Sequence, residues 1–340
     1  MSEHNSETVR MVELTRGAVV ECAHRGALAI VDASGRLLAA AGNPQHVAYL
    51  RSAAKPFQAL PTVDAGALDH FNLDQRALAL MCASHHGTEE HVQVCQHILD
   101  TIGLDASALR CGVHWPIDEA ASRRLAAAGL EPDARHNNCS GKHAGMLTLT
   151  RFLGLEELDY TQPDHPVQQA ILTRLCALTD LTPAEIQTAP DGCTVPAFAL
   201  PLASVALAFA RLIDPNAPAD CRRAVAAMQA YPHLVSGHNA LDDQLMRAGA
   251  GALVSKGGAE GYQGIGIRTP DGRSVGLALK IEDGNARAKG PMIYAALSAL
   301  GLVDAAVLAR LEPLRRPAIV NHRQQVVGAV QTAATFDLTT

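Results

Sequence analysis

The chain has 340 residues, of which 48% are hydrophobic, 18% charged and 4% aromatic, and its formal net charge is −6. These values fit one or two globular domains with a sizeable core and exclude a disordered or coiled-coil chain. No basic block stands out, so nucleic acid is not expected as a partner. The chain begins with the polar segment MSEHNSETVR, which lacks an apolar signal core.

Strands are predicted at 17–31 and 36–41, where two apolar runs flank the turn Asp32-Ala-Ser-Gly35. A helix follows at 53–65 with Pro56 in its first turn. Apolar spacing then predicts helices at 89–102, 119–128, 141–152, 167–178 and 201–213. The longest apolar stretch, 195–213, is interrupted by two prolines and an arginine, so we expect a buried helix there and no membrane span. Strands return at 251–257, 264–269 and 274–281, before a closing helix at 291–301.

Strands at both ends of the chain can pair in one sheet, with the helical middle inserted between them. We therefore predict a mixed α/β (α+β) fold with an antiparallel sheet flanked by helices and a separate helical lobe. The sheet domain would comprise residues 1–65 and 236–340, and the mainly helical lobe residues 66–235. A ligand site is expected in a cleft between the two parts.

Cysteine and lysine usage carry further information. The eight cysteines are scattered without a CxxC pair, which predicts reduced thiols and a cytoplasmic location. Only five of the 28 basic residues are lysines, namely Lys55, Lys142, Lys256, Lys280 and Lys289. Arginine keeps its proton, whereas a buried lysine can lose it. Each lysine is therefore a candidate for chemistry that needs a neutral amine, and codon bias is the simpler alternative.

The segment Ser52-Ala-Ala-Lys55 opens the helix predicted at 53–65. The lysine lies one helical turn after the serine, where a neutral amine can accept the serine proton. The same spacing also occurs at ordinary helix starts. Lys256-Gly-Gly lies near the end of a predicted strand and corresponds to the K-[ST]-G strand of penicillin-recognising enzymes, with glycine in place of the hydroxyl residue. The alternative for Lys256 is a charge that reaches solvent, although the glycines favour close backbone approach.

Three other polar groups of residues follow apolar runs or precede a helix. Ser84, in Ala-Ser-His-His-Gly, could act as a second serine with Lys256, but its spacing favours an ordinary N-cap before the helix predicted at 89–102. Cys139 and Lys142 share a helical face, and Cys193 lies in the turn DGCTVP. Two thiolates could bind zinc if the fold brings them together. The alternative is two buried free cysteines.

Together these segments resemble the Rhizobium-type L-asparaginases of the asparaginase II family. The resemblance spans nearly the whole chain, through RSAAKPFQ, CASHHG, NNCSGKHAGML, DGCTVPAFALPL, SKGGAEG and GLALKIEDG. It implies a fold similar to serine β-lactamases and glutaminases. It also implies a small-molecule substrate, L-asparagine, which is hydrolysed to L-aspartate and ammonia, and a homodimer.

Residue by residue, the resemblance implies two Ser-Lys pairs, Ser52 with Lys55 and Ser84 with Lys256, and leaves open which serine is the nucleophile. Lys280 is an alternative second lysine. The resemblance further implies one zinc ion per chain held by Cys139, Lys142 and Cys193, with substrate contacts from Arg51, Asp191 and His143. The other activities considered are a glutaminase or a penicillin-recognising hydrolase on the same scaffold, and a zinc-dependent amino-acid sensor without turnover.

Overall fold

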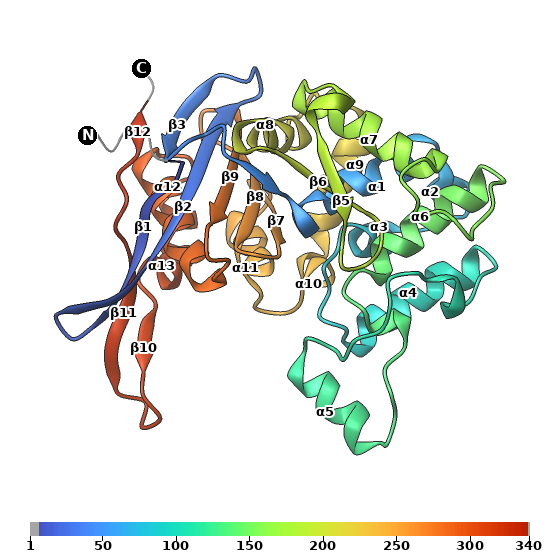
Figure 1. Ribbon diagram of the computed structural model, residues 1–340, viewed down its shortest axis with the longest axis horizontal. Coiled ribbons are helices and arrows are strands. Elements are labelled where there is room, and N and C mark those ends of the chain that lie inside the picture. The colour runs from blue at the N-terminus through green and yellow to red at the C-terminus, as the bar shows by residue number, and fades with distance from the viewer. Residues whose placement is uncertain (1–6, 339–340) are drawn as a thin grey trace. The chain divides into compact units, whose positions relative to one another are not determined.

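The computed structural model describes residues 7–338, so the first six residues of the polar N-terminus lie outside the described part. The chain forms two compact units (Figure 1). The sheet unit comprises Met1–Ala53, Ala199–Asp214 and Gln244–Thr340, and the helical unit comprises Ala54–Phe198 and Pro215–Asp243. Between residues 7 and 338, no helix has both the length and the apolar character that a membrane span requires.

A large antiparallel sheet forms the sheet unit. Its strands follow the order β10-β11-β1-β2-β9-β8-β7, with β3 beside β2 and β12 beside β3. Their bounds are β1 (Val9–Arg16), β2 (Val19–Asp32), β3 (Leu37–Ala41), β7 (Leu253–Gly258), β8 (Tyr262–Arg268), β9 (Ser274–Ile281), β10 (Ala318–Val320), β11 (Val326–Thr332) and β12 (Asp337–Leu338). Strand β2 pairs with β9, and Ala29 lies opposite Ala278. The predicted pairing of strands from both chain ends in one antiparallel sheet is therefore confirmed.

Helices cover both faces of this sheet: α8 (Leu202–Leu212), α12 (Lys289–Ala299), which follows the short turn η6 (Ala286–Ala288), and α13 (Ala305–Arg315). A Cβ atom on Gly276 would lie only 1.7 Å from the carbonyl oxygen of Ala206, so glycine lets α8 approach the sheet closely. Gln263 pairs with Leu279, which points to the opposite face from Gly276 because side chains alternate along a strand. Lys289 Nζ donates to Gln263 Oε1 at 3.1 Å, so the start of α12 lies on that opposite face.

Three short elements lie where the chain passes between the two units in sequence. Strand β4 (Val47–Tyr49) pairs antiparallel with the end of β6 (Pro196–Pro201), and α11 (Leu241–Gly249) precedes β7. The apolar stretch 195–213, which we expected to form a buried helix, is therefore a strand followed by a helix. Pro201 has extended backbone and is the N-cap of α8, which explains why the helix begins only there.

The helical unit contains nine helices within its described residues: α1 (Lys55–Asp64), α2 (Ala67–His70), α3 (Gln75–Met81), α4 (Glu89–Thr101), α5 (Glu119–Ala127), α6 (Ser140–Phe152), α7 (Pro166–Thr179), α9 (Ala219–Ala230) and α10 (Pro232–Val235). It also contains the short turns η3 (Ala106–Ala108), η4 (Ala134–His136) and η5 (Pro183–Glu185) and strand β5 (Gln187–Pro190). The helices predicted at 89–102, 119–128, 141–152 and 167–178 are confirmed to within two residues.

Two glycines of α6 allow that helix to lie against the end of α3. A Cβ atom on Gly141 would lie 2.1 Å from the carbonyl oxygen of Leu80, and one on Gly145 would lie 2.9 Å from the side chain of Met81. The two glycines are four residues apart and therefore share a helical face. This close packing places the N-terminus of α6 beside the loop that follows α3, where several candidate site residues lie.

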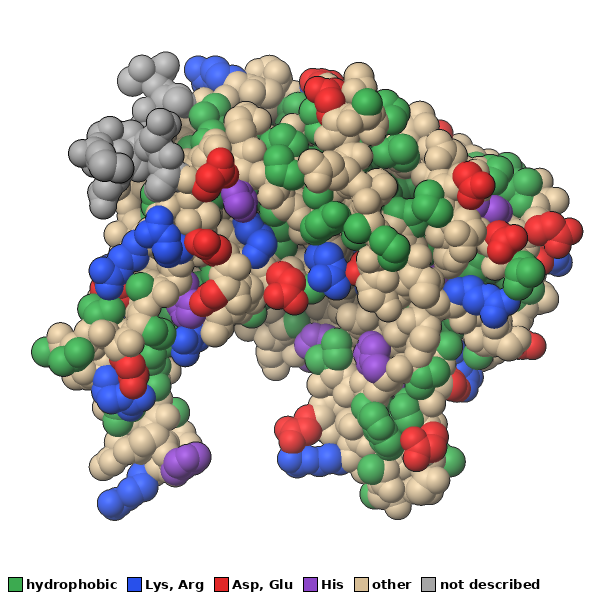
Figure 2. Space-filling view, viewed as in Figure 1, with side chains coloured by type: hydrophobic (Ala, Val, Ile, Leu, Met, Phe, Trp, Pro, Cys, Tyr) green, Lys and Arg blue, Asp and Glu red, His purple; other side chains and the backbone are tan. Residues whose placement is uncertain are grey.

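Charged side chains of both signs are interspersed over the visible face of the molecule, leaving aside the grey residues (Figure 2). This distribution agrees with the net charge of −6.

The packing of α8 on the sheet gives a test of the fold. We expect Gly276→Ala to lower the free energy of unfolding by about 1–3 kcal/mol, because its Cβ atom would force the backbone of α8 away from β9. Gly290→Ala in α12 is the matched control, since its Cβ atom would meet its nearest neighbour at an ordinary 3.5 Å. Denaturant unfolding of both variants measures the difference, and equal stabilities would contradict the proposed packing.

Candidate active site

The loop that follows α3 holds Ser84 by its backbone. The amide of Ser84 donates to the carbonyl oxygen of Val235 at 2.9 Å. Gly87 has a φ of +73°, which explains the glycine at the end of this loop. Thr88, not Ser84, is the N-cap of α4, and it forms a capping box with His91. The helix-cap explanation for Ser84 is therefore wrong, because the helix begins four residues too late for Ser84 to reach its first amides.

Lys55 lies at the start of α1, has no exposed surface and points at Ser84. Its Nζ donates to Ser84 Oγ at 2.8 Å and to the carbonyl oxygen of Asn138 at 3.0 Å. A buried amine is costly unless it is hydrogen-bonded, and these two acceptors meet that requirement. A lysine amine in contact with a serine hydroxyl is the geometry that Ser-Lys nucleophilic catalysis needs.

Ser52 lies in the sheet unit, in the short turn η2 (Arg51–Ala54). The preceding residue, Arg51, has a φ of +50°, a conformation that costs a non-glycine residue free energy and that often marks functional sites. A Cβ atom on Gly258 would lie 2.3 Å from the carbonyl oxygen of Leu50. The glycines after Lys256 therefore allow the close backbone approach that the sequence predicts, and they bring β7 against the turn that carries Ser52.

Lys256 and Lys280 both lie in the sheet unit. Lys256 is only 1% exposed, and its Nζ donates to the carbonyl oxygen of Gly257 at 2.8 Å. The alternative of a solvent-exposed charge at Lys256 is thus wrong, because β7 is covered at this point. Lys280 is half-buried, and its amine donates to the carbonyl oxygens of Glu260, at 2.7 Å, and Ile281. Burial lowers the pKa of Lys280. Which of the two is the second catalytic lysine stays a prediction.

Two buried thiols meet in the helical unit. Cys139 is the N-cap of α6, and its amide donates to Asn137 Oδ1 at 2.8 Å. Its side chain is hydrogen-bonded to that of Cys193. This contact lowers the pKa of Cys139 and raises that of Cys193. The fold therefore joins the two cysteines, and neither forms a disulfide.

Lys142 completes this cluster. It is 3% exposed, and its Nζ lies 3.9 Å from Asp191 Oδ2. Burial by itself lowers the pKa of Lys142, but the neighbouring Cys139, Cys193 and Asp191 outweigh burial and raise the pKa. The amine is therefore charged when no metal is bound, and a metal would have to displace its proton. The two thiols and the carboxylate are donors of the kinds that zinc binds, whereas a lysine amine is not one of its usual ligands.

His143 is fully buried in the middle of the helical unit. Its Nδ1 lies 2.6 Å from the hydroxyl of Tyr160, and burial lowers the pKa of His143 well below its ordinary value. The amide of Arg110 donates to the same hydroxyl at 2.9 Å. Substrate binding by His143 stays a prediction, and its observed contact is with Tyr160, a residue that sequence analysis did not single out.

Three histidines, His85, His91 and His233, contact one another in or next to the loop that carries Ser84. The rings of His85 and His91 stack with centroids 4.9 Å apart, and His85 Nε2 is 2.8 Å from Ser140 Oγ. His91 Nε2 donates to the carbonyl oxygen of His233 at 3.1 Å, since its Nδ1 accepts from the amide of Thr88 at 3.2 Å. These residues were not predicted as site residues, because they lie in segments that only the fold brings together.

A family model described as L-asparaginase II matches residues 12–332. The chain therefore belongs to this family and, with it, to the amidohydrolases. No curated protein sequence is significantly similar to the chain.

Three solved structures illustrate the similarity to known folds. The native form of Mglu aligns with 82% of this chain and 66% of its own, just under two thirds, at 13% identity and a TM-score of 0.44. A β-lactamase from Sphaerobacter thermophilus aligns with 82% of this chain and 92% of its own, at 14% identity and 0.43. A Bacillus glutaminase aligns with 82% and 91%, at 15% and 0.37.

We expect the contact of His91 with the segment that holds Ser84 to weaken in acid, because the His91 ring is buried. Burial lowers the pKa of His91 to about 4 from the usual 6.5, so the folded state binds fewer protons than the unfolded state between these values. The contribution of His91 to the free energy of unfolding is therefore fully present above pH 6.5. It falls by roughly 3 kcal/mol as the pH drops to 4. We expect His91→Gln to lose less free energy of unfolding than the wild type between pH 6.5 and 4, as measured by denaturant unfolding. His97→Gln, an exposed position on the same helix, should keep the wild-type slope.

Proposed function

We propose that the chain is an L-asparagine amidohydrolase that uses a Ser-Lys nucleophile. The observation that carries this proposal is the 2.8 Å hydrogen bond from the buried Lys55 amine to the Ser84 hydroxyl. Family membership supports an amide substrate. Two features support a functional role for the Ser52 turn as well. Arg51 has a positive φ, and Gly258 lies close to the neighbouring backbone.

In the proposed reaction a serine oxygen attacks the side-chain amide carbon of L-asparagine while a neutral lysine amine accepts the hydroxyl proton. Backbone amides beside the serine stabilise the oxyanion. The lysine then returns the proton to the leaving ammonia, and water hydrolyses the acyl-enzyme to L-aspartate. Ser52 and Ser84 are both candidates for the nucleophile, with Lys55 and either Lys256 or Lys280 as the amines.

We also propose that Arg51, Asp191 and His143 contribute to substrate binding. Asp191 has the clearest support, because its carboxylate lies close to the Lys142 amine at the edge of the thiol cluster. One carboxylate and one cationic side chain are the groups that an amino-acid substrate, with its own ammonium and carboxylate, requires. The scattered free cysteines support a cytoplasmic location. The homodimer also stays a proposal.

The proposal includes one zinc ion per chain, held by Cys139, Lys142 and Cys193. The paired thiols, the adjacent amine and the nearby carboxylate of Asp191 support it. When bound, zinc would supply a Lewis acid that orients the substrate. In the proposed reaction the nucleophile is a serine of the chain, and the proton transfers are made by the lysine amines.

Purified protein is expected to release ammonia from L-asparagine and much less from L-glutamine. A single extra methylene changes turnover by roughly 10–200-fold in a simple pocket. Ammonia release at matched concentrations of the two amides measures this preference. Equal turnover of both would overturn the choice of L-asparagine, and no turnover of either would favour a sensor.

Variants test the machinery under the same assay. We expect Ser52→Ala, Ser84→Ala, Lys256→Ala and Lys55→Arg each to lose activity by about 100-fold or more, with the fold kept. Lys55→Arg tests the proton transfer directly, because arginine cannot accept a proton. Ser298→Ala, at an exposed position on α12, is the control and should keep full activity. Near-normal rates in Lys55→Arg would remove Lys55 as the base.

Metal analysis tests the zinc proposal. We expect about one zinc per chain in protein purified without chelator or metal-binding tag, and loss of this zinc in Cys139→Ala and Cys193→Ala. Cys176→Ala is the control, because Cys176 is half-exposed on α7. Zinc binding should release protons and weaken at low pH, since Lys142 and the thiols must be deprotonated to act as ligands. Full activity without zinc would remove any catalytic role for it.

A further inference from the structure

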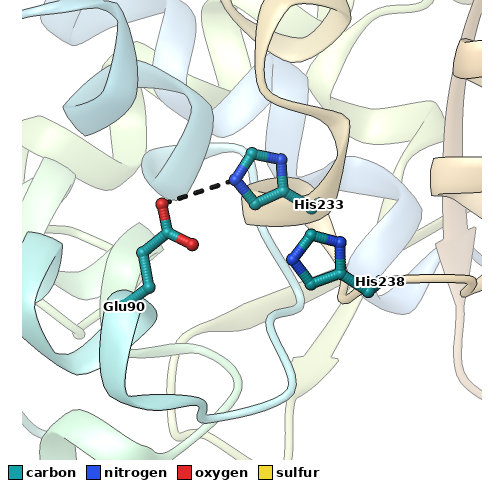
Figure 3. Close-up of side chains that lie close together, drawn as sticks. All are labelled: Glu90, His233 and His238. Carbon is teal, nitrogen blue, oxygen red and sulfur yellow. Dashed lines mark hydrogen bonds and ion pairs between the residues drawn. The ribbon is translucent and has the colours of Figure 1, made fainter.

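A second cluster of metal-ligating side chains lies in the helical unit. Glu90 is in the first turn of α4, His233 is in α10, and His238 follows α10 by three residues. One ligand atom of each residue lies within 4.8 Å of the other two. Figure 3 shows the carboxylate and one ring nitrogen of each histidine facing a common space. None of the three was assigned to the proposed reaction.

The donor set is chemically distinct from the thiol cluster. Two imidazoles and one carboxylate form the ligand set of several zinc sites, and imidazole also suits copper and nickel. Bonds of about 2.0–2.2 Å place tetrahedral ligands about 3.4 Å apart. His233 Nε2 and Glu90 Oε1 already have this spacing, and a ligand atom of His238 lies within 4.8 Å of the other two residues. The exposed His238 can rotate to reach this spacing, while Glu90 and His233 are half-buried and remain accessible to an ion.

Neighbouring groups orient two of the three ligands. Arg76 donates to Glu90 Oε1 at 2.8 Å, and the backbone carbonyl of His233 accepts from His91. His233 Nε2, the ring nitrogen that faces Glu90, is the one available to an ion. Among the described residues, the other ring nitrogen, the buried Nδ1, has no hydrogen-bond partner.

We propose that Glu90, His233 and His238 bind a divalent transition-metal ion such as Zn²⁺ through two imidazole nitrogens and one carboxylate oxygen. This site is separate from the thiol cluster and does not depend on the proposed amidohydrolase activity. His233 Nε2 already lies 3.4 Å from Glu90 Oε1, and the rings of His233 and His238 stack at 9° with centroids 4.9 Å apart. The ion would replace the present contact between His233 and Glu90 by bonds from all three residues.

Metal binding here would act on the support of Ser84. The ion would join α4 to the segment 232–238, which holds the Ser84 amide through the carbonyl oxygen of Val235. The same segment packs closely on the Ser84 loop, because a Cβ atom on Gly237 would lie 2.4 Å from His86 Nδ1. A metal-bound segment 232–238 should therefore open less often, and the Ser84 amide should exchange its hydrogen more slowly.

The test is a Zn²⁺ titration by calorimetry on chelator-stripped protein without a histidine tag. We expect the wild type to bind one equivalent more than His238→Ala does, whether or not the thiol cluster also binds zinc. Glu90→Gln should weaken that same equivalent at least about tenfold. His97→Ala removes an exposed histidine from the same helix and should bind as the wild type does. Equal stoichiometry and affinity in the wild type and His238→Ala would overturn the proposal.

Hydrogen exchange gives an independent measurement that needs no change in the thiol cluster. Added Zn²⁺ should slow exchange at the Ser84 amide and through 232–238 in the wild type, and should leave it unchanged in His238→Ala. The outcome is separable from failure of the proposed function, since it uses no substrate. Zinc-dependent protection that persists in His238→Ala would assign the effect to the thiol cluster and overturn the proposal.

Discussion

A lysine amine that leaves water must find acceptors inside the protein, and this constraint organises the candidate site. Four of the five lysines are less than 10% exposed: Lys55, Lys142, Lys256 and Lys289. Their partners differ in chemistry. Lys55 meets a serine hydroxyl and a carbonyl oxygen, whereas Lys142 meets two cysteine side chains and a carboxylate. The first environment brings the amine into contact with a hydroxyl, and the second raises the pKa of the amine and so favours its charged form.

Much of the fold could be predicted, because its central elements carry strong periodic signals. The hairpin β2-β3, the strands β7 to β9 and most of the long helices follow directly from apolar spacing and glycine stops. Strands β1, β10 and β11 were missed. In β1, half-exposed Glu13 and Thr15 interrupt the apolar pattern. The strand pairs with β2 across a tight turn and with β11, more than 300 residues away in sequence, and the second pairing has no local signal.

The candidate site was predicted only where its residues share short motifs. Cys139 and Lys142 lie on one helical turn, and the fold then brings Cys193 to them, which the sequence could state only as a condition. The partners of Lys55 were harder to predict. Its acceptor Asn138 contributes a backbone carbonyl, and backbone groups carry no residue-specific signal. The cluster of Glu90, His233 and His238 was missed for a related reason, since Glu90 lies more than 140 residues before the two histidines and shares no motif with them.

A serine that attacks an amide must be fixed both in position and in the direction of its hydroxyl, and the two requirements fall on different parts of the helical unit. Lys55 holds the hydroxyl of Ser84, while the carbonyl oxygen of Val235 holds its amide. In the proposed reaction with Ser84 as the nucleophile, the hydroxyl contact changes as the proton moves, so it cannot by itself keep the backbone still. The backbone contact can stay throughout that reaction, provided that the segment 232–238 is itself restrained. This segment is therefore as much a part of the site as the lysine is, although none of its side chains was implied by a catalytic motif.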